Sequence, residues 1–144
     1  MMKASARNQL EGIIDNVSIG AVYVEVFIKL KGGEALVASI TKQSYDTLNI
    51  KVGVEVLALV KAPQIIVVSD FGDYKITARN QFKTIITHIK PGAVNAEVIM
   101  KLKGGETLTA TITNDSVETL GLNKNAEVTA IFKASAVILA FKNA

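Results

Sequence analysis

The amino-acid sequence predicts an all-β protein built from two tandem OB-like five-stranded β-barrel domains, each with one short helix. Three observations lead to this fold class. The chain repeats itself, apolar and polar residues alternate in short runs, and each repeat holds one brief stretch with helix-capping residues. A repeat of about 70 residues is near the smallest size at which a chain folds alone. We therefore expect the two repeats, or several chains, to pack together.

The internal repeat is visible when the chain is aligned with itself at a shift of roughly 72 residues. Ala6–Gln9 then matches Ala78–Gln81, and Leu30–Glu34 matches Leu102–Glu106, without a gap. About 30 of 67 paired positions are identical. The segment Ser69–Lys75 has turn residues and no periodicity, which is typical of a linker. These limits predict a first domain at residues 1–68, a linker at 69–75 and a second domain at 76–144.

The first half of each repeat predicts a β-hairpin. Residues Val22–Leu30 alternate between apolar and polar side chains, and Val94–Leu102 repeat the pattern. A Lys-Gly-Gly-Glu segment follows in both copies, and its paired glycines permit the positive φ angles of a tight turn. A returning strand is expected at Leu36–Ile40 and at Leu108–Ile112.

The second half of each repeat predicts a short helix and two further strands. Residues Thr41–Leu48 and Thr113–Leu120 begin with a hydroxyl residue that can cap free amides, so we expect one or two helical turns. Strands are then predicted at Glu55–Lys61 and Ile65–Val68, and in the second copy at Glu127–Lys133 and Val137–Ala140. The order strand, strand, strand, short helix, strand, strand fits an OB-like barrel.

Composition and charge narrow the class of function. Sixteen Lys and Arg residues against thirteen Asp and Glu residues leave a formal charge of +3, which without clustering does not indicate nucleic-acid binding. The chain has no cysteine, so a disulfide framework and a thiolate metal site are excluded. No stretch has the apolar length of a signal peptide or a membrane span, and a cytoplasmic location is the expectation.

Few residues could carry catalysis, and we expect no enzyme activity. His88 is the single histidine, and Asn16 takes its place in the first copy, so an ordinary strand-end histidine is the favoured interpretation. Three acidic positions recur in both copies, and for these we expect solvated surface positions. They are Glu25 with Glu97, Glu34 with Glu106, and Glu55 with Glu127.

A set of cationic and hydroxyl donors also recurs in both copies. Arg7 precedes the first strand, Lys61 ends a later strand, and Thr41 with Ser44 begins the short helix. Guanidinium, ammonium and hydroxyl donors together can satisfy a tetrahedral dianion. Structural roles are the alternative for each residue alone: a helix cap, a carboxylate partner, or a solvated strand end. The full set comprises Ser5, Arg7, Thr41, Ser44 and Lys61, with Thr77, Arg79, Thr113, Ser116 and Lys133 in the second copy.

Four segments carry a resemblance to a known family. They are Ser5–Gln9, Gly92–Val98, Ile40–Ser44 and Val60–Pro63, and the resemblance extends over nearly the whole chain, twice. The chain resembles the molbindin (Mop) family of molybdenum-pterin-binding proteins in its tandem, two-domain arrangement. The resemblance implies neither the helix-turn-helix domain of the related molybdate-dependent regulator nor the ATPase domain of the related transporter.

The resemblance implies a function and a set of ligand residues. It implies a cytoplasmic protein for storage or homeostasis that binds molybdate or tungstate between domains, as a homotrimer of two-domain chains and without a catalytic cofactor. The implied ligands are Ser5, Arg7, Lys61, Ala62 and Pro63 with Thr41 and Ser44 of a neighbour, and Thr77, Arg79, Lys133, Ala134 and Ser135 with Thr113 and Ser116. A second class of site would use the backbone of Gly20, Ala21 and Val22 and of Gly92, Ala93 and Val94.

Two departures from the family pattern fall in these ligand sets. Thr77 replaces a serine and keeps a hydroxyl, whereas Pro63 replaces a serine and loses both the hydroxyl and an amide donor. We therefore expect similar but unequal sites in the two copies.

Two other classes of function stay open at this stage. A single-stranded nucleic-acid-binding OB module would need aromatic side chains along a basic groove, and the eight aromatic residues here seldom recur between the copies. A protein-interaction module would show no selective uptake of an oxyanion.

Overall fold

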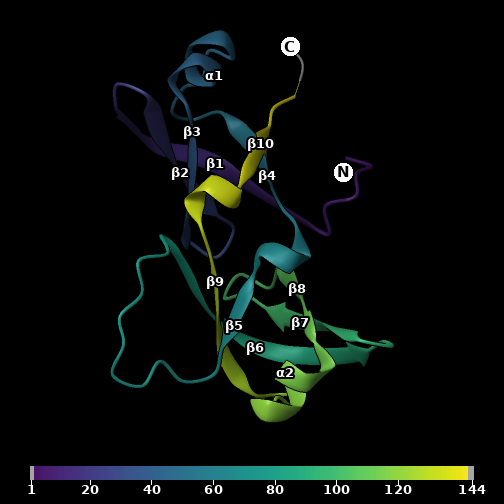
Figure 1. Cartoon of the computed structure of the whole chain (residues 1–144). Helices are drawn as coiled ribbons and strands as arrows, with labels where there is room; N and C mark the ends of the chain where they lie inside the picture. The colour runs from purple at the N-terminus through teal and green to yellow at the C-terminus, as the bar shows by residue number, and fades with distance from the viewer. Residues whose placement is uncertain (1, 143–144) are drawn as a thin grey trace.

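The computed structural model describes residues 2–142, which form two small five-stranded antiparallel barrels (Figure 1). The first barrel contains β1 (Asn8–Ile19), β2 (Tyr23–Leu30), β3 (Ala35–Thr41), β4 (Glu55–Val60) and β10 (Ile138–Ala140). The second contains β5 (Ile66–Val68), β6 (Asn80–Pro91), β7 (Asn95–Lys101), β8 (Thr107–Thr113) and β9 (Glu127–Phe132). Between strands lie the helices α1 (Lys42–Thr47) and α2 (Asn114–Thr119) and the 3₁₀ turns η1 (Ala62–Gln64) and η2 (Ala134–Ala136).

The two repeats exchange their last strands. The strand order is β10-β4-β1-β2-β3 in one sheet and β5-β9-β6-β7-β8 in the other, so Ile138 lies opposite Leu59 and Ile66 lies opposite Ile131. No sequence pattern predicts this exchange. Because β4 and β9 are equivalent strands of similar sequence, the pattern of a three-residue strand does not tell which of them it pairs with.

The hairpin and the short helix form where the sequence predicts them. Along β2 the side chains of Val24, Val26 and Ile28 are fully buried, which fits the alternating pattern. The turn before β3 has Gly33 at a φ of +87°, a conformation that glycine adopts without steric cost. Thr41 caps α1, because its side chain accepts a hydrogen bond from the amide of Ser44.

The long first strand of each repeat bends at a β-bulge. In β1 the pairing with β2 shifts between Ile14 and Asn16, and in β6 the pairing with β7 shifts between Ile86 and His88. A bulge bends and twists the strand, which lets it pair with β4 or β9 at one end and with β2 or β7 at the other. His88 is exposed at the bulge, and it lies inside β6 and not at its end.

The barrels meet at their Lys-Gly-Gly-Glu turns. A Cβ atom added to Gly32 would lie 2.5 Å from the backbone nitrogen of Gly104, so only glycine permits this approach. Each repeat makes equivalent contacts with the other, so an approximate twofold axis relates the two repeats. No helix within residues 2–142 is long and apolar enough to cross a membrane.

Candidate functional site

The first donor set lies where β1 begins and β4 ends. Asn8 and Val60 form the last pair of the β1–β4 ladder, so Arg7 and Lys61 are the next residues outward at the same end of the ladder. Both side chains are exposed, and Ser5 precedes them on the exposed N-terminal segment. The register therefore brings two of the predicted cations together, with a predicted hydroxyl close by in the chain.

The second donor set has the same construction. Asn80 pairs with Phe132 at the end of the β6–β9 ladder, so Arg79 and Lys133 follow at that end, and Thr77 precedes Arg79 by two residues. Two cations at the same exposed end of a ladder repel one another unless an anion or a carboxylate lies near them. Each set is therefore a place where negative charge is favoured.

Each lysine is followed by a 3₁₀ turn that packs against the other repeat. η1 contacts β8 and η2 contacts β3, and Ala62 and Ala134 are buried at the two contacts. The exposed residue next to them differs, because Ser135 has a hydroxyl and an amide N–H that Pro63 lacks. Neither turn was predicted as a regular element from the sequence.

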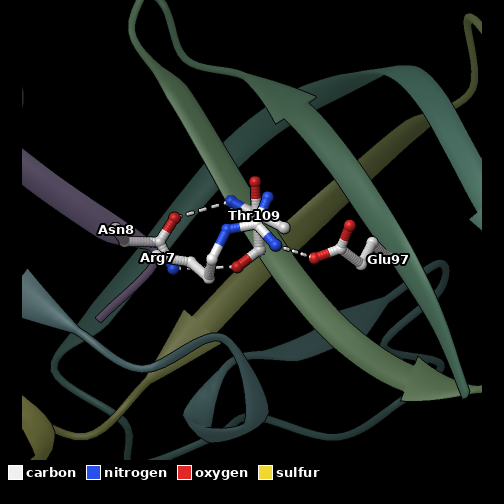
Figure 2. Close-up of polar contacts among 4 residues, drawn as sticks. All are labelled: Arg7, Asn8, Glu97 and Thr109. Carbon is white, nitrogen blue, oxygen red and sulfur yellow. Dashed lines mark hydrogen bonds and ion pairs between the residues drawn. The ribbon is translucent and has the colours of Figure 1, made fainter. Parts of the chain in front are cut away.

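Two buried asparagines fix each donor set onto the other repeat. The side chain of Asn8 donates to the carbonyl oxygen of Thr109 at 2.8 Å and accepts from its amide at 2.7 Å (Figure 2). Asn80 makes the same two bonds to Val37, both at 2.8 Å. These amides satisfy the outer edges of β8 and β3, which pair with one strand each.

Each arginine forms an ion pair with a glutamate of the other repeat. Arg7 reaches Glu97 of β7, as Figure 2 shows, and Arg79 reaches Glu25 of β2 with 2.5 Å between Nη1 and Oε2. The guanidinium of Arg79 also lies over the ring of Phe27, 5.9 Å from its centroid. The interpretation of Glu25 and Glu97 as solvated surface residues is therefore wrong. They point outward from their own sheet, but the other repeat packs against that face.

The helix-cap residue Thr113 lies on β8, the strand that pairs with the strand of Glu97. Glu97, the partner of Arg7, lies opposite Thr111 in the β7–β8 ladder, and Thr113 follows on the same face of β8. Two residues along a strand span about 7 Å. Thr41 has the same relation to Arg79, because Glu25 lies opposite Ser39.

The hydroxyl residues are caps in this structure. Thr113 accepts from the amide of Ser116 at 3.0 Å and donates to its hydroxyl at 2.8 Å, and Thr41 and Ser44 do the same at 3.1 and 2.9 Å. The capping role weighed as the alternative is thus present. A ligand role for these four residues stays a prediction.

The predicted backbone sites are exposed turns that are tied to the helices. Gly20 donates to the carbonyl oxygen of Tyr23 at 2.9 Å, and Lys42 at the start of α1 donates to that of Val22 at 2.8 Å. Gly92, Ala93 and Val94 form the matching turn. The amides of Gly20 and Gly92 donate within their own turns, to Tyr23 and Asn95, and the ligand role of these turns stays a prediction.

The main groove in the described part of the chain lies apart from the predicted ligand residues. A groove of about 1230 Å³ over β1 and β4 contains none of the predicted ligand residues. Glu106 lines it, and its carboxylate oxygens are buried without a hydrogen-bond partner, unlike the solvated residue that the sequence indicated. Within residues 2–142 no three His, Cys, Asp or Glu side chains are grouped closely enough to hold a metal ion.

The fold and the two matching donor sets define a class of protein: a tandem pair of small β-barrels with an anion-attracting surface at each junction. The chain belongs to the TOBE domain family, whose profile matches residues 4–67 and 76–139.

Relatives agree with this assignment. The chain is 37% identical over 139 residues to the molybdenum transport protein ModE of Herbaspirillum seropedicae, and 39% identical over 139 residues to the molybdenum-pterin-binding protein MopA of Rhodobacter capsulatus. Both alignments cover 96% of this chain and 52% of the relative, so the chain spans about half the length of these curated relatives.

A solved structure matches the whole chain. It is a crystal structure of the cytoplasmic molybdate-binding protein ModG with molybdate bound, with a TM-score of 0.94 and 42% sequence identity, and the match covers 98% of this chain and 100% of that one. The predicted fold class and the resemblance to molbindins are confirmed.

Proposed function

We propose that this chain binds molybdate or tungstate reversibly, as a cytoplasmic protein for molybdenum storage or homeostasis, without catalysing a reaction. The observation that carries the proposal is that each of two equivalent ladders ends at a pair, Asn8 with Val60 and Asn80 with Phe132, that is followed outward by one arginine and one lysine. The similarity to ModG over the full chain supports it, because that protein is a cytoplasmic molybdate-binding protein.

The proposed ligand atoms are almost all donors. Arginine supplies a planar fork of N–H groups, lysine a compact charge, and Ser5 or Thr77 a directional hydroxyl. A fully deprotonated tetrahedral dianion can accept from all of them. An anion that keeps a proton would point its O–H at donors and lose a hydrogen bond, so phosphate should bind less tightly than molybdate.

The proposed sites are completed across interfaces. One set comprises Ser5, Arg7, Lys61, Ala62 and Pro63, the other comprises Thr77, Arg79, Lys133, Ala134 and Ser135, and each is joined by a Thr-Ser pair, Thr41 with Ser44 or Thr113 with Ser116. The turns at Gly20–Val22 and Gly92–Val94 would form a second class of site between chains.

We propose a homotrimer of two-domain chains. Support comes from aliphatic side chains left exposed on strands of both barrels, namely Ile13, Ile66, Ile85 and Ile138. A protein that exposes such residues on matching strands is expected to cover them in an assembly. Native mass spectrometry tests this directly, and a monomeric mass at micromolar concentration would contradict the trimer.

Nucleic-acid binding is less well supported. Phe82 and Phe132 stack in the second core with 5.7 Å between ring centroids, so they cannot stack on bases. Polarisation with a labelled single strand at low salt, where electrostatic binding is strongest, distinguishes the two functions.

Titration calorimetry with molybdate, sulfate and phosphate tests the proposed function. We expect tight binding of molybdate and weak binding of phosphate. Arg79→Ala should weaken molybdate binding at its site by roughly 2 kcal/mol or more, because it removes charged donors. Lys83→Ala, on the same strand but away from the donor sets, is the control. Equal or absent heats for the three anions would refute molybdate binding.

A further inference from the structure

The arginine in each proposed site is already held by a negative charge. Nη1 of Arg7 contacts Glu97, and Nη1 of Arg79 contacts Glu25, so both sites contain the same pair built from opposite repeats. Lys61 and Lys133 form no such pair within the described part of the chain. Each donor set therefore has one neutralised cation and one free cation.

The ion pairs are accessible to an incoming anion. The side chains of Arg7 and Arg79 are 53% and 48% exposed, whereas those of Glu97 and Glu25 are 29% and 32% exposed. The glutamates lie within paired strands, opposite Thr111 and Ser39, so their backbone is fixed. An oxyanion could thus approach the guanidinium from solvent while the carboxylate stays close.

We propose that Glu97 and Glu25 are internal counter-ions, which occupy the arginines when no oxyanion is bound and lower the affinity of the sites for oxyanions. This inference rests on the proposed function. The carboxylate accepts from a donor that the oxyanion needs, and a carboxylate attached to the same chain competes at a high effective concentration. After displacement it still repels the bound anion, in proportion to the charge of that anion.

Three possible roles of the glutamates differ in how their removal changes the affinity for anions. A glutamate that only orients the arginine would make binding weaker when it is replaced. A glutamate that only joins the repeats would change the stability of the protein and leave affinity unchanged. A counter-ion has a different signature, because its removal strengthens binding, and more for a dianion than for a monoanion of the same shape.

The test compares the full chain with Glu25→Gln/Glu97→Gln in titration calorimetry with molybdate and with perrhenate, a tetrahedral monoanion. Glutamine keeps the size of the side chain and removes its charge. We expect the variant to bind molybdate roughly two- to fivefold more tightly, the range set by half-exposed ion pairs, and perrhenate with a smaller gain. The control variant is Glu127→Gln, which removes one negative charge at an exposed residue that forms no ion pair within residues 2–142. It should leave the affinities for molybdate and perrhenate unchanged.

Each outcome decides between the possibilities. Unchanged or weaker molybdate binding by a folded variant, equal gains for both anions, or an equal gain in Glu127→Gln would overturn the counter-ion role while the proposed function stands. Binding by the variant but not by the natural chain would support it. Absence of binding by both proteins would overturn the proposed function together with this inference. The single variants Glu25→Gln and Glu97→Gln should each strengthen only one class of site, and they replace the double variant if it does not fold.

Discussion

The two junctions between the repeats are nearly identical, whereas the two barrel cores are packed differently. At the junctions Asn8 and Asn80 make the same pair of hydrogen bonds, and all four distances fall between 2.7 and 2.8 Å. A junction asparagine must offer one donor and one acceptor at fixed positions, which few side chains can do. The junction therefore permits little change in sequence.

The cores differ in size and shape at matching positions. Leu10 and Val60 in the first barrel correspond to Phe82 and Phe132 in the second, and all four are buried. Gly12 corresponds to Thr84, which donates to the carbonyl oxygen of Val128 at 3.0 Å. Apolar contacts are not directional, so a core can exchange volume between neighbours as long as it stays filled. The comparison shows that directional bonds are kept between the repeats while packing changes.

The largest effect is expected from truncating the aromatic core of the second barrel. Phe132→Ala should lower the free energy of unfolding by about 4 kcal/mol, because it leaves a cavity beside Phe82, and Val60→Ala at the matching position should cost roughly 2 kcal/mol. Urea titration followed by circular dichroism measures both. Since the barrels exchange strands, each variant should still unfold in one transition, and two separate transitions would contradict the coupling.

A smaller but symmetrical effect is expected at the junctions. Asn8→Ala and Asn80→Ala should each cost about 3 kcal/mol of unfolding free energy, because a buried amide and a buried carbonyl lose their partners. The two values should agree within about 1 kcal/mol if the junctions are equivalent. Asn95→Ala, at an exposed position, serves as the control and should stay within about 0.5 kcal/mol. If the free energies lost in Asn8→Ala and Asn80→Ala differed as much as those lost in Phe132→Ala and Val60→Ala, the two junctions would not be equivalent.

Exchanging a core position between the barrels tests whether packing is local. A Cβ atom at residue 12 would collide with Cγ2 of Ile28 and lie 2.9 Å from the carbonyl oxygen of Lys29. Gly12→Thr alone should therefore destabilise the protein by roughly 2 kcal/mol. Adding Ile28→Met, the residue that accompanies Thr84 in the second barrel, should restore part of that loss, because methionine is unbranched. No recovery in thermal unfolding would show that the backbone itself blocks the exchange.

The smallest expected effect concerns residue 63, one of the two positions at which the donor sets differ. Pro63→Ser restores a hydroxyl and an amide N–H, and should strengthen molybdate binding at that site by less than about 1.5 kcal/mol. Ser135→Pro should weaken the other class of site by a similar amount. Calorimetry that resolves two classes of site in the natural chain and one class in Pro63→Ser would support the assignment. Identical isotherms would place residue 63 outside the site.

Local elements of this fold were predictable because their signals are local. The alternation in β2, the paired glycines of the turn and the cap at Thr41 each fix nearby backbone, and the structure confirms them. The exchange of β5 and β10 was not predictable, since three apolar residues pair equally well with either of two similar strands. The 3₁₀ turn after Lys61 was missed because three residues carry no periodicity.

The sequence indicated the residue types proposed for the candidate site but not their contacts with the other repeat. Arg7 and Arg79 were found because charged donors recur in both repeats. The glutamates that pair with them also recur, but their contact depends on how the repeats pack, which no local pattern describes. Asn8 and Asn80 lie inside the repeated segments Ala6–Gln9 and Ala78–Gln81. Their recurrence in both copies was the sequence signal that could have indicated a structural role.

The strand exchange makes the covalent linker dispensable for holding the halves together. Residues 69–79 are mostly exposed and join β5 to β6 in a long loop (Figure 1). Each half contributes a strand to the other barrel, so a chain cut by a protease in this loop should remain a two-fragment complex with native circular dichroism. The loop then affects the rate of folding, because it holds the two halves at an effective concentration of about millimolar. Two separate fragments would first have to meet by diffusion.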